Sequence, residues 1–203
     1  AANGIYSVAN KFPNVFINFY NILNLSWTES VSLHYEDPDR NEFLSETITS
    51  FFKLFAASCF GIVACMPFVF PFFINKEFGT SYNQILILMY AMLFRVLVGL
   101  YSCIYVAQKK AKKIASTSIA AAMINIIVNL ILINFIGLFA ASLSTFVAFL
   151  VMFIIRYNDI NKTVKMKIEK SIIWGSISIG GMLAFSYYSN NMIFQMVTLF
   201  ITI

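Results

Sequence analysis

Long apolar stretches separated by short polar connections dominate this sequence of 203 residues. A helix crosses the hydrocarbon layer of a bilayer with about 20 mostly apolar residues. The candidate spans are residues 4–28, 47–74, 82–107, 114–135, 138–155, 171–188 and 192–203. No strand-like alternation is sustained, and an open sheet leaves unpaired backbone groups in lipid. The sequence therefore predicts an all-α, polytopic transmembrane helix bundle of about seven spans, the last of them truncated.

The charge content supports the same conclusion. Charged residues make up 11% of the chain, whereas ordinary soluble domains carry roughly 25%, which argues against a soluble enzyme. The net charge of +5 does not indicate nucleic acid as a partner. Nine of the fourteen Lys and Arg residues fall in two short runs, 109–113 and 156–170, and no basic face forms.

The distribution of cations predicts the orientation of the bundle. Because successive spans alternate in direction, the connections form two sets, one with ten cations and the other with Lys76 alone. The larger set comprises Arg40, Lys109, Lys110, Lys112, Lys113, Arg156, Lys162, Lys165, Lys167 and Lys170. By the positive-inside rule this set, which includes the acidic connection 29–46 and the basic connection 157–170, is cytoplasmic.

Residues that hold metals or carry out hydrolysis are missing from the predicted spans. The three cysteines lie in apolar stretches without CxxC spacing, and the only histidine, His34, lies in a connection. The acidic residues within 36–39 do not have the spacing of a calcium loop. No Asp or Glu lies at the middle of a span, so we expect no metal, no cofactor and no enzymatic activity.

The first span carries a stripe of polar residues. Ser7, Lys11, Asn14, Asn18 and Asn21 follow one another at steps of four, three, four and three, which places them on one face of a helix. A charged group near the middle of a bilayer costs a few kcal/mol, so this face is not expected to point at lipid. It borders a watery cavity, or its asparagines hydrogen-bond to a neighbouring helix.

A second cation, Arg95, lies near the centre of the third span with no acidic residue within a helical turn. Two interpretations remain open. Arg95 is satisfied by backbone carbonyls or by an asparagine of a neighbouring helix, or it binds an anionic substrate. Asn125 and Asn129 form a weaker stripe, for which we expect a contact between helices.

Three prolines lie inside the predicted spans. Pro13 falls near the middle of the first, and Pro67 and Pro71 lie near the end of the second. Proline removes a backbone hydrogen bond and its ring presses on the preceding turn, so we expect bends at these positions.

Several segments resemble one family of transporters. They are Asn3–Pro13 (NGIYSVANKFP), Phe78–Tyr82 (FGTSY), Gln108–Lys110 (QKK) and Asn134–Thr145 (NFIGLFAASLST). Their sequence and order resemble segments of the polysaccharide flippases of the MOP superfamily, the Wzx-like exporters of O-antigen and related repeat units. The likeness covers nearly the whole chain and corresponds to the last seven helices of a fourteen-helix protein. The proline that often follows the asparagine in the family's last segment is absent after Asn134.

This resemblance implies a fold, a substrate and partners. The chain would be the C-terminal, MATE-like second lobe of a longer transporter in the bacterial inner (plasma) membrane, working with an N-terminal lobe of the same protein. It would flip an undecaprenyl-pyrophosphate-linked oligosaccharide by alternating access, for cell-surface polysaccharide biosynthesis. Lys11 and Arg95 would lie near the central cavity and bind the pyrophosphate, with Ser7, Asn14, Asn18 and Asn21 contacting the sugar. Membrane lipids are further expected partners.

Two other functions stay open at this stage. A multidrug and toxin extrusion-type exporter of cationic drugs would need carboxylates within the spans, and none is present. An integral-membrane glycosyl polymerase would need a large outward loop with catalytic residues, whereas the longest outward connection, 75–81, is short.

Overall fold

The computed structural model describes residues 2–166, 169–189 and 191–202, and these residues form helices and no strand. The helices are α1 (Ala2–Ala9), α2 (Lys11–His34), α3 (Arg40–Phe73), the 3-10 helix η1 (Lys76–Ser81), α4 (Tyr82–Ala107), α5 (Ala111–Ile136), α6 (Phe139–Ile160), α7 (Lys170–Tyr188) and α8 (Met192–Thr202). The predicted all-helical class is confirmed for this part of the chain.

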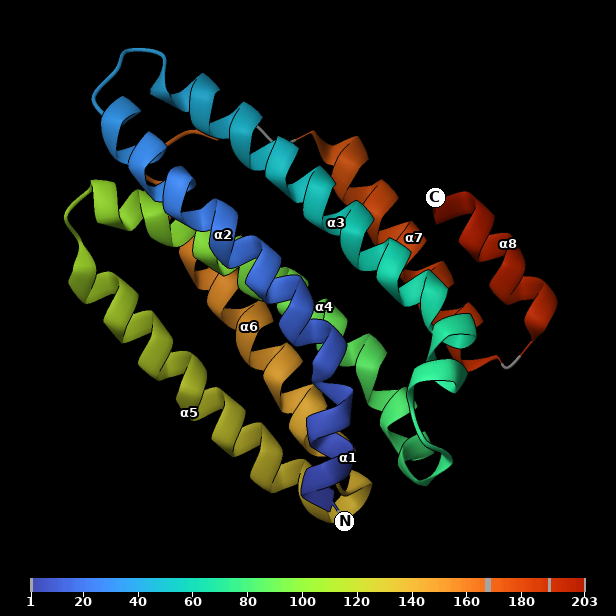
Figure 1. Cartoon of the computed structure of the whole chain (residues 1–203). Helices are drawn as coiled ribbons and strands as arrows, with labels where there is room; N and C mark the ends of the chain where they lie inside the picture. Colours follow the sequence, from blue (N-terminus) through green and yellow to red (C-terminus); the bar gives the residue numbers. More distant parts are fainter. Residues whose placement is uncertain (1, 167–168, 190, 203) are drawn as a thin grey trace.

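Helix α4 is the centre of the bundle. It packs against α2, α3 and α6, while α5 packs on the outside of α6, and α7 and α8 pack on α3 (Figure 1). A helix that is apolar all round is either buried in protein or surrounded by lipid, and the chain contains both cases. Most residues of α4 are buried, whereas α5 buries only Thr117 and Ala121.

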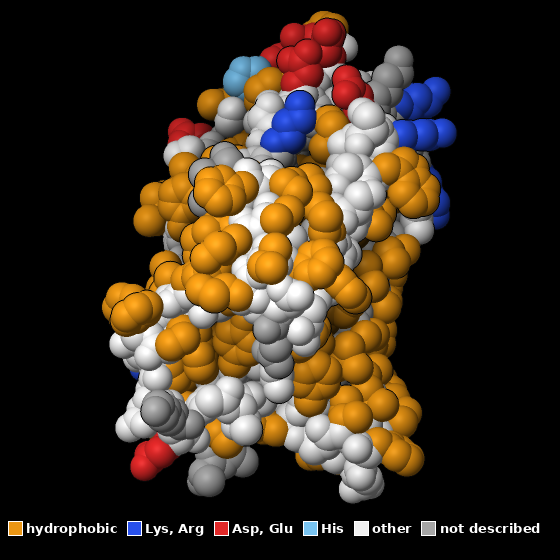
Figure 2. All heavy atoms as spheres, turned by 90° about the vertical axis from the view of Figure 1, so that its right-hand side faces the viewer, with side chains coloured by type: hydrophobic (Ala, Val, Ile, Leu, Met, Phe, Trp, Pro, Cys, Tyr) orange, Lys and Arg blue, Asp and Glu red, His pale blue; other side chains and the backbone are white. Residues whose placement is uncertain are grey.

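Four helices are long and apolar enough to cross a membrane: Arg40–Phe73, Glu77–Ala107, Ala111–Ile136 and Phe139–Ile160. Figure 2 shows hydrophobic side chains covering the length of the molecule, with most of the visible charged side chains at one end. The described residues thus have the helices of a membrane protein. The predicted count of seven spans and the MATE-like arrangement stay predictions, because α2, α7 and the shorter α8 are not among these four helices.

The connections that follow α2, α4 and α6 meet at one end of the bundle (Figure 1). Gln108, between α4 and α5, donates hydrogen bonds from Nε2 to the Tyr35 hydroxyl at 2.8 Å and to Thr163 Oγ1 at 3.0 Å. Lys113 and Asp159 form an ion pair at 3.2 Å. The connections that follow α2, α4 and α6 therefore form one polar end, as the alternation of spans predicts.

Two of the predicted connections were too long. Helix α2 continues to His34 and α3 begins at Arg40, so the acidic connection is 35–39 instead of 29–46. Helix α6 likewise continues to Ile160. The reason is that apolar residues recur at helical spacing beyond the bilayer-length stretch. Val31 and Leu44, for example, are buried in the helical extensions.

The helix assignment differs at the two predicted proline positions. The helix is interrupted at Asn10, between α1 and α2, three residues before the buried Pro13. Pro13 has no N–H for the carbonyl of Ala9, and its ring presses on the same turn. Helix α3, in contrast, is one continuous helix through Pro67 and Pro71.

The close approach of α2 to α4 depends on Gly99. A Cβ atom at this position would lie 2.7 Å from Cζ of Tyr20 and still closer to its hydroxyl oxygen. Tyr20 is buried, its ring centroid lies 5.5 Å from that of Phe55, and its hydroxyl donates to Asn24 Oδ1 at 2.5 Å. Phe55 and Asn24 therefore hold the Tyr20 ring in its place beside Gly99.

We expect Gly99→Ala to lower the free energy of unfolding by about 1–3 kcal/mol, the usual cost of overpacking. The measurement is the thermal unfolding midpoint of the purified protein. Gly175→Ala is the matched control, because a Cβ atom at Gly175 meets nothing within 4 Å. Equal midpoints for the two variants would contradict the close contact between Gly99 and Tyr20. In a protein that also carries Tyr20→Leu, the Gly99→Ala change is expected to lower the midpoint much less.

Candidate functional site

The five polar residues predicted to share a helix face do so, and we call them the α2 polar face: Ser7, Lys11, Asn14, Asn18 and Asn21. All five side chains are exposed in the described structure. The opposite side of α2 carries the buried residues Pro13, Phe16, Ile17, Tyr20, Trp27 and Val31. No described helix covers the polar face, so the predicted hydrogen bonds from its asparagines to a neighbouring helix do not form among the described residues.

Ser7 stays in line with the rest although it belongs to α1. The backbone N–H of Asn10 donates to the carbonyl of Tyr6 at 3.1 Å, and that of Asn14 donates to the carbonyl of Asn10 at 2.9 Å. The Asn10 side chain also donates to the Tyr6 carbonyl, at 2.8 Å. Hydrogen bonds of helical spacing thus run through the interruption, and the register of the face is kept.

Arg95 is exposed on the most buried helix of the bundle. Between Gln84 and Tyr105 it is the only exposed residue of α4. Its Nη1 donates to Met92 Sδ at 3.9 Å, a weak contact, and no other hydrogen bond or ion pair of this side chain is found among the described residues. Most of the donors of the guanidinium are therefore free.

The neighbours of Arg95 on α4 fix its position in the bundle. Gly99, one turn further along, is covered by Tyr20 of α2. Val98 and Ser102 contact α6 through Arg156. Arg95 therefore lies on the strip of α4 between the contact with α2 and the contact with α6, beside the helix that carries the polar face.

Polar contacts set the orientation of α2 on α4. The Trp27 indole N–H donates to the carbonyl of Leu100 at 3.2 Å. Asn24 Oδ1 accepts from the Tyr20 hydroxyl at 2.5 Å and from Cys103 Sγ at 3.4 Å. These contacts hold the buried side of α2 against α4, so the α2 polar face points away from α4.

The sequence did not lead us to expect that Arg156 is buried. Arg156, assigned to a connection, lies in α6 with only 2% of its surface exposed. Its guanidinium donates to acceptors of α4 and α5, which are Thr117 Oγ1 at 3.0 Å, Val98 O at 3.1 Å, Ile114 O at 3.3 Å, Ser118 Oγ at 3.1 Å and Ser102 Oγ. The arrangement that was one option for Arg95 is therefore found at Arg156.

All acceptors of Arg156 are neutral. No carboxylate forms an ion pair with it among the described residues. Five donors directed at two neighbouring helices make Arg156 a structural link between α4, α5 and α6. The sequence signal that would have found it is the set of hydroxyl residues at 102, 117 and 118 inside otherwise apolar spans.

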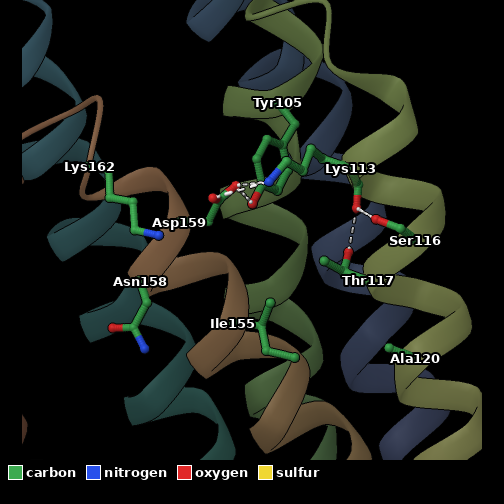
Figure 3. Close-up of a pocket in the computed structure, with 9 residues that line it drawn as sticks. All are labelled: Tyr105, Lys113, Ser116, Thr117, Ala120, Ile155, Asn158, Asp159 and Lys162. Carbon is green, nitrogen blue, oxygen red and sulfur yellow. Dashed lines mark hydrogen bonds and ion pairs between the residues drawn. The ribbon is translucent and has the colours of Figure 1, made fainter.

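A polar cleft of about 450 Å³ lies between α5 and α6 at the lysine-rich end (Figure 3). Asp159 accepts from the Tyr105 hydroxyl at 2.9 Å and from Lys113 Nζ at 3.2 Å. Figure 3 shows Lys162 and Asn158 on the α6 side of this cleft. Lys113 and Tyr105 thus hold the one carboxylate of the cleft, and Lys162 also lines it.

Asn125 and Asn129 of α5 were expected to contact a neighbouring helix. Asn125 Nδ2 donates to Thr145 Oγ1 at 3.3 Å, which confirms the expected contact for Asn125. Asn129 does not follow it, because its buried Oδ1 has no hydrogen-bond partner among the described residues. The described residues contain no group of three or more His, Cys, Asp or Glu side chains arranged to hold a metal ion. The candidates that remain are Arg95 and the α2 polar face, which lie on neighbouring helices, and no hydrogen bond or ion pair joins them among the described residues.

Comparisons with protein families, with curated proteins and with solved structures find no match to this chain.

Proposed function

We propose that the protein flips an undecaprenyl-pyrophosphate-linked oligosaccharide across the bacterial inner membrane by alternating access, as part of cell-surface polysaccharide biosynthesis. The observation that carries the proposal is the exposed, nearly unpaired guanidinium of Arg95 at the centre of an otherwise buried apolar helix. A charge in that position is costly against lipid and is explained by an aqueous cavity or an anionic ligand. The resemblance to Wzx-like flippases of the MOP superfamily supports the same substrate class.

The chemistry of the candidate site matches the two parts of such a substrate. A guanidinium binds phosphate oxygens in pairs through its planar fork of donors, and an ammonium adds a second point charge. Arg95 and Lys11 therefore bind the pyrophosphate. Asn14, Asn18, Asn21 and Ser7 offer amide and hydroxyl groups, which donate to and accept from sugar hydroxyls.

The α2 polar face is one wall of the proposed cavity. In this proposal the facing wall comes from an N-terminal lobe of the same protein, as in the family that the chain resembles. The lysine-rich end faces the cytoplasm by the positive-inside rule, so the substrate enters on that side and leaves on the side of η1.

The charges of the site favour this function over its alternatives. A carrier of cationic drugs needs a carboxylate in the membrane, whereas neither α4 nor the α2 polar face contains Asp or Glu. A glycosyl polymerase needs an acid or base near the membrane surface. The candidate site, Arg95 and the α2 polar face, contains neither a carboxylate nor a histidine.

Transport by the full-length protein in vesicles tests the proposal. The vesicles contain a fluorescent polyprenyl-pyrophosphate oligosaccharide, and a lectin added outside reports the fraction of sugar in the outer leaflet. We expect sugar to become accessible faster than in protein-free vesicles, and we expect no movement of tetraphenylphosphonium, a lipophilic cation. Movement of the cation without movement of the sugar would favour the drug exporter instead.

A further inference from the structure

An apolar groove of about 640 Å³ lies between α6 and α7, on a floor formed by α3 and α4. We call it the α6–α7 groove. Helices α6 and α7 both pack on the central part of the bundle but barely touch each other among the described residues, which leaves the space between them open. The volume lies within the range of roughly 300–1,000 Å³ that is usual for ligand sites.

Aromatic rings line much of this groove. They include Phe94 and Tyr101 of α4 together with Phe146, Phe153 and Tyr157 of α6, and the rings of Phe94 and Phe153 lie 5.9 Å apart between centroids. An unfilled space deprives such a lining of dispersion contacts. Because the groove runs along helices of membrane-spanning length, acyl chains are the material available to fill it.

Two polar groups lie toward one end of the groove, the hydroxyl of Tyr101 in its lining and the ammonium of Lys170 beyond it. The hydroxyl of Tyr101 is buried and has no hydrogen-bond partner among the described residues, and the ring of Tyr157 lies 6.0 Å from that of Tyr101. Ile173 and Ile177 of α7 line the groove. Lys170 precedes them by three and seven residues on the same helix. It is exposed and shares their side of the helix.

We propose that the α6–α7 groove binds an anionic phospholipid from the leaflet at the lysine-rich end. One acyl chain lies along the aromatic lining, and the headgroup phosphate binds Lys170. The hydroxyl of Tyr101 donates a hydrogen bond to an ester carbonyl oxygen of the glycerol region. An apolar length that ends in a hydroxyl donor and a cation is complementary to a lipid with a negative headgroup.

The position of the groove distinguishes this lipid from the transported substrate. Leu93 and Leu97 line the groove, and each lies two residues from Arg95, which places them on the opposite side of α4. A lipid in the groove therefore does not reach the α2 polar face. The proposal stands independently of the proposed function and is tested without transport.

Photolabelling of the full-length protein tests the proposal. The vesicles contain phosphatidylglycerol with a diazirine in one acyl chain, and the labelled residues are mapped by mass spectrometry. Gly181 lines the groove and a Cβ atom there meets nothing within 4 Å, so we expect the ring of Gly181→Phe to occupy part of the groove. Gly175→Phe, on the same helix but outside the groove, is the matched control.

We expect labels on α4, α6 and α7 in the wild type and in Gly175→Phe. In Gly181→Phe we expect roughly tenfold less label, equivalent to about 1.4 kcal/mol of binding free energy. Lys170→Gln, an exposed change that does not threaten folding, is expected to remove the preference for phosphatidylglycerol over phosphatidylcholine. Unchanged labelling in Gly181→Phe would overturn the proposal. Labelling of the groove by a diazirine polyprenyl phosphate but not by phosphatidylglycerol would also overturn it.

Discussion

Arg95→Ala is expected to abolish flipping of the lipid-linked oligosaccharide while the amount of folded protein stays near that of the wild type. The side chain is exposed and makes one weak contact, with Met92, so its removal leaves no cavity and breaks no network. A phosphate group that loses a charged hydrogen-bond partner loses about 2–5 kcal/mol, or a factor of about thirty or more in affinity. The vesicle assay and the membrane abundance of the variant are measured side by side.

Companion variants separate binding from a merely structural role. Lys11→Ala is expected to act in the same direction, and Arg95→Lys to restore only part of the transport, because an ammonium lacks the planar fork. Lys53→Ala is the matched control, since Lys53 is an exposed cation of α3 outside the candidate site. Normal transport by the Lys11→Ala, Arg95→Ala double variant would remove both residues from the proposed site. A loss of protein instead of transport would make Arg95 structural.

The parts of the structure that follow local periodicity were predictable. The third span was expected at 82–107, and α4 has the same bounds, because its apolar run ends at polar residues on both sides. The α2 polar face was predictable for the same reason, since helical spacing alone aligns Ser7 through Asn21. The exposure of Arg95 was not, because it depends on which neighbours α4 acquires.

Features made by several helices together were not visible in the sequence. The acceptors of Arg156 lie between 38 and 58 residues away along the chain. A cation followed by Tyr157, Asn158 and Asp159 has the composition of a connection exposed to water. The α6–α7 groove likewise follows from the separation of two helices, each of which is an ordinary apolar segment.

Arg156→Ala is expected to produce the largest loss of stability in the chain. Truncation of a side chain that is 2% exposed leaves a cavity between α4, α5 and α6, and such truncations cost about 2–5 kcal/mol. We expect little folded protein in the membrane and a markedly lower unfolding midpoint after purification.

Arg156→Met is expected to recover most of that loss. Methionine fills much of the volume, and the hydroxyl groups left behind keep partners, because Ser102 donates to Val98 O at 2.6 Å and Thr117 donates to Lys113 O at 2.8 Å. Replacing a buried charge by an apolar side chain of similar size is often nearly neutral. Equal instability of the Met and Ala variants would show that the charge, and not the volume, holds the three helices together.

The Met variant also separates Arg156 from the proposed substrate site. Arg156 is buried and bonded to α4 and α5, whereas Arg95 is exposed, so only Arg95 is available to a pyrophosphate. Folded Arg156→Met protein is therefore expected to flip the lipid-linked oligosaccharide at close to the wild-type rate. A folded but inactive Arg156→Met protein would place Arg156 in the transport mechanism and would require the α4–α5–α6 contact to open during the cycle.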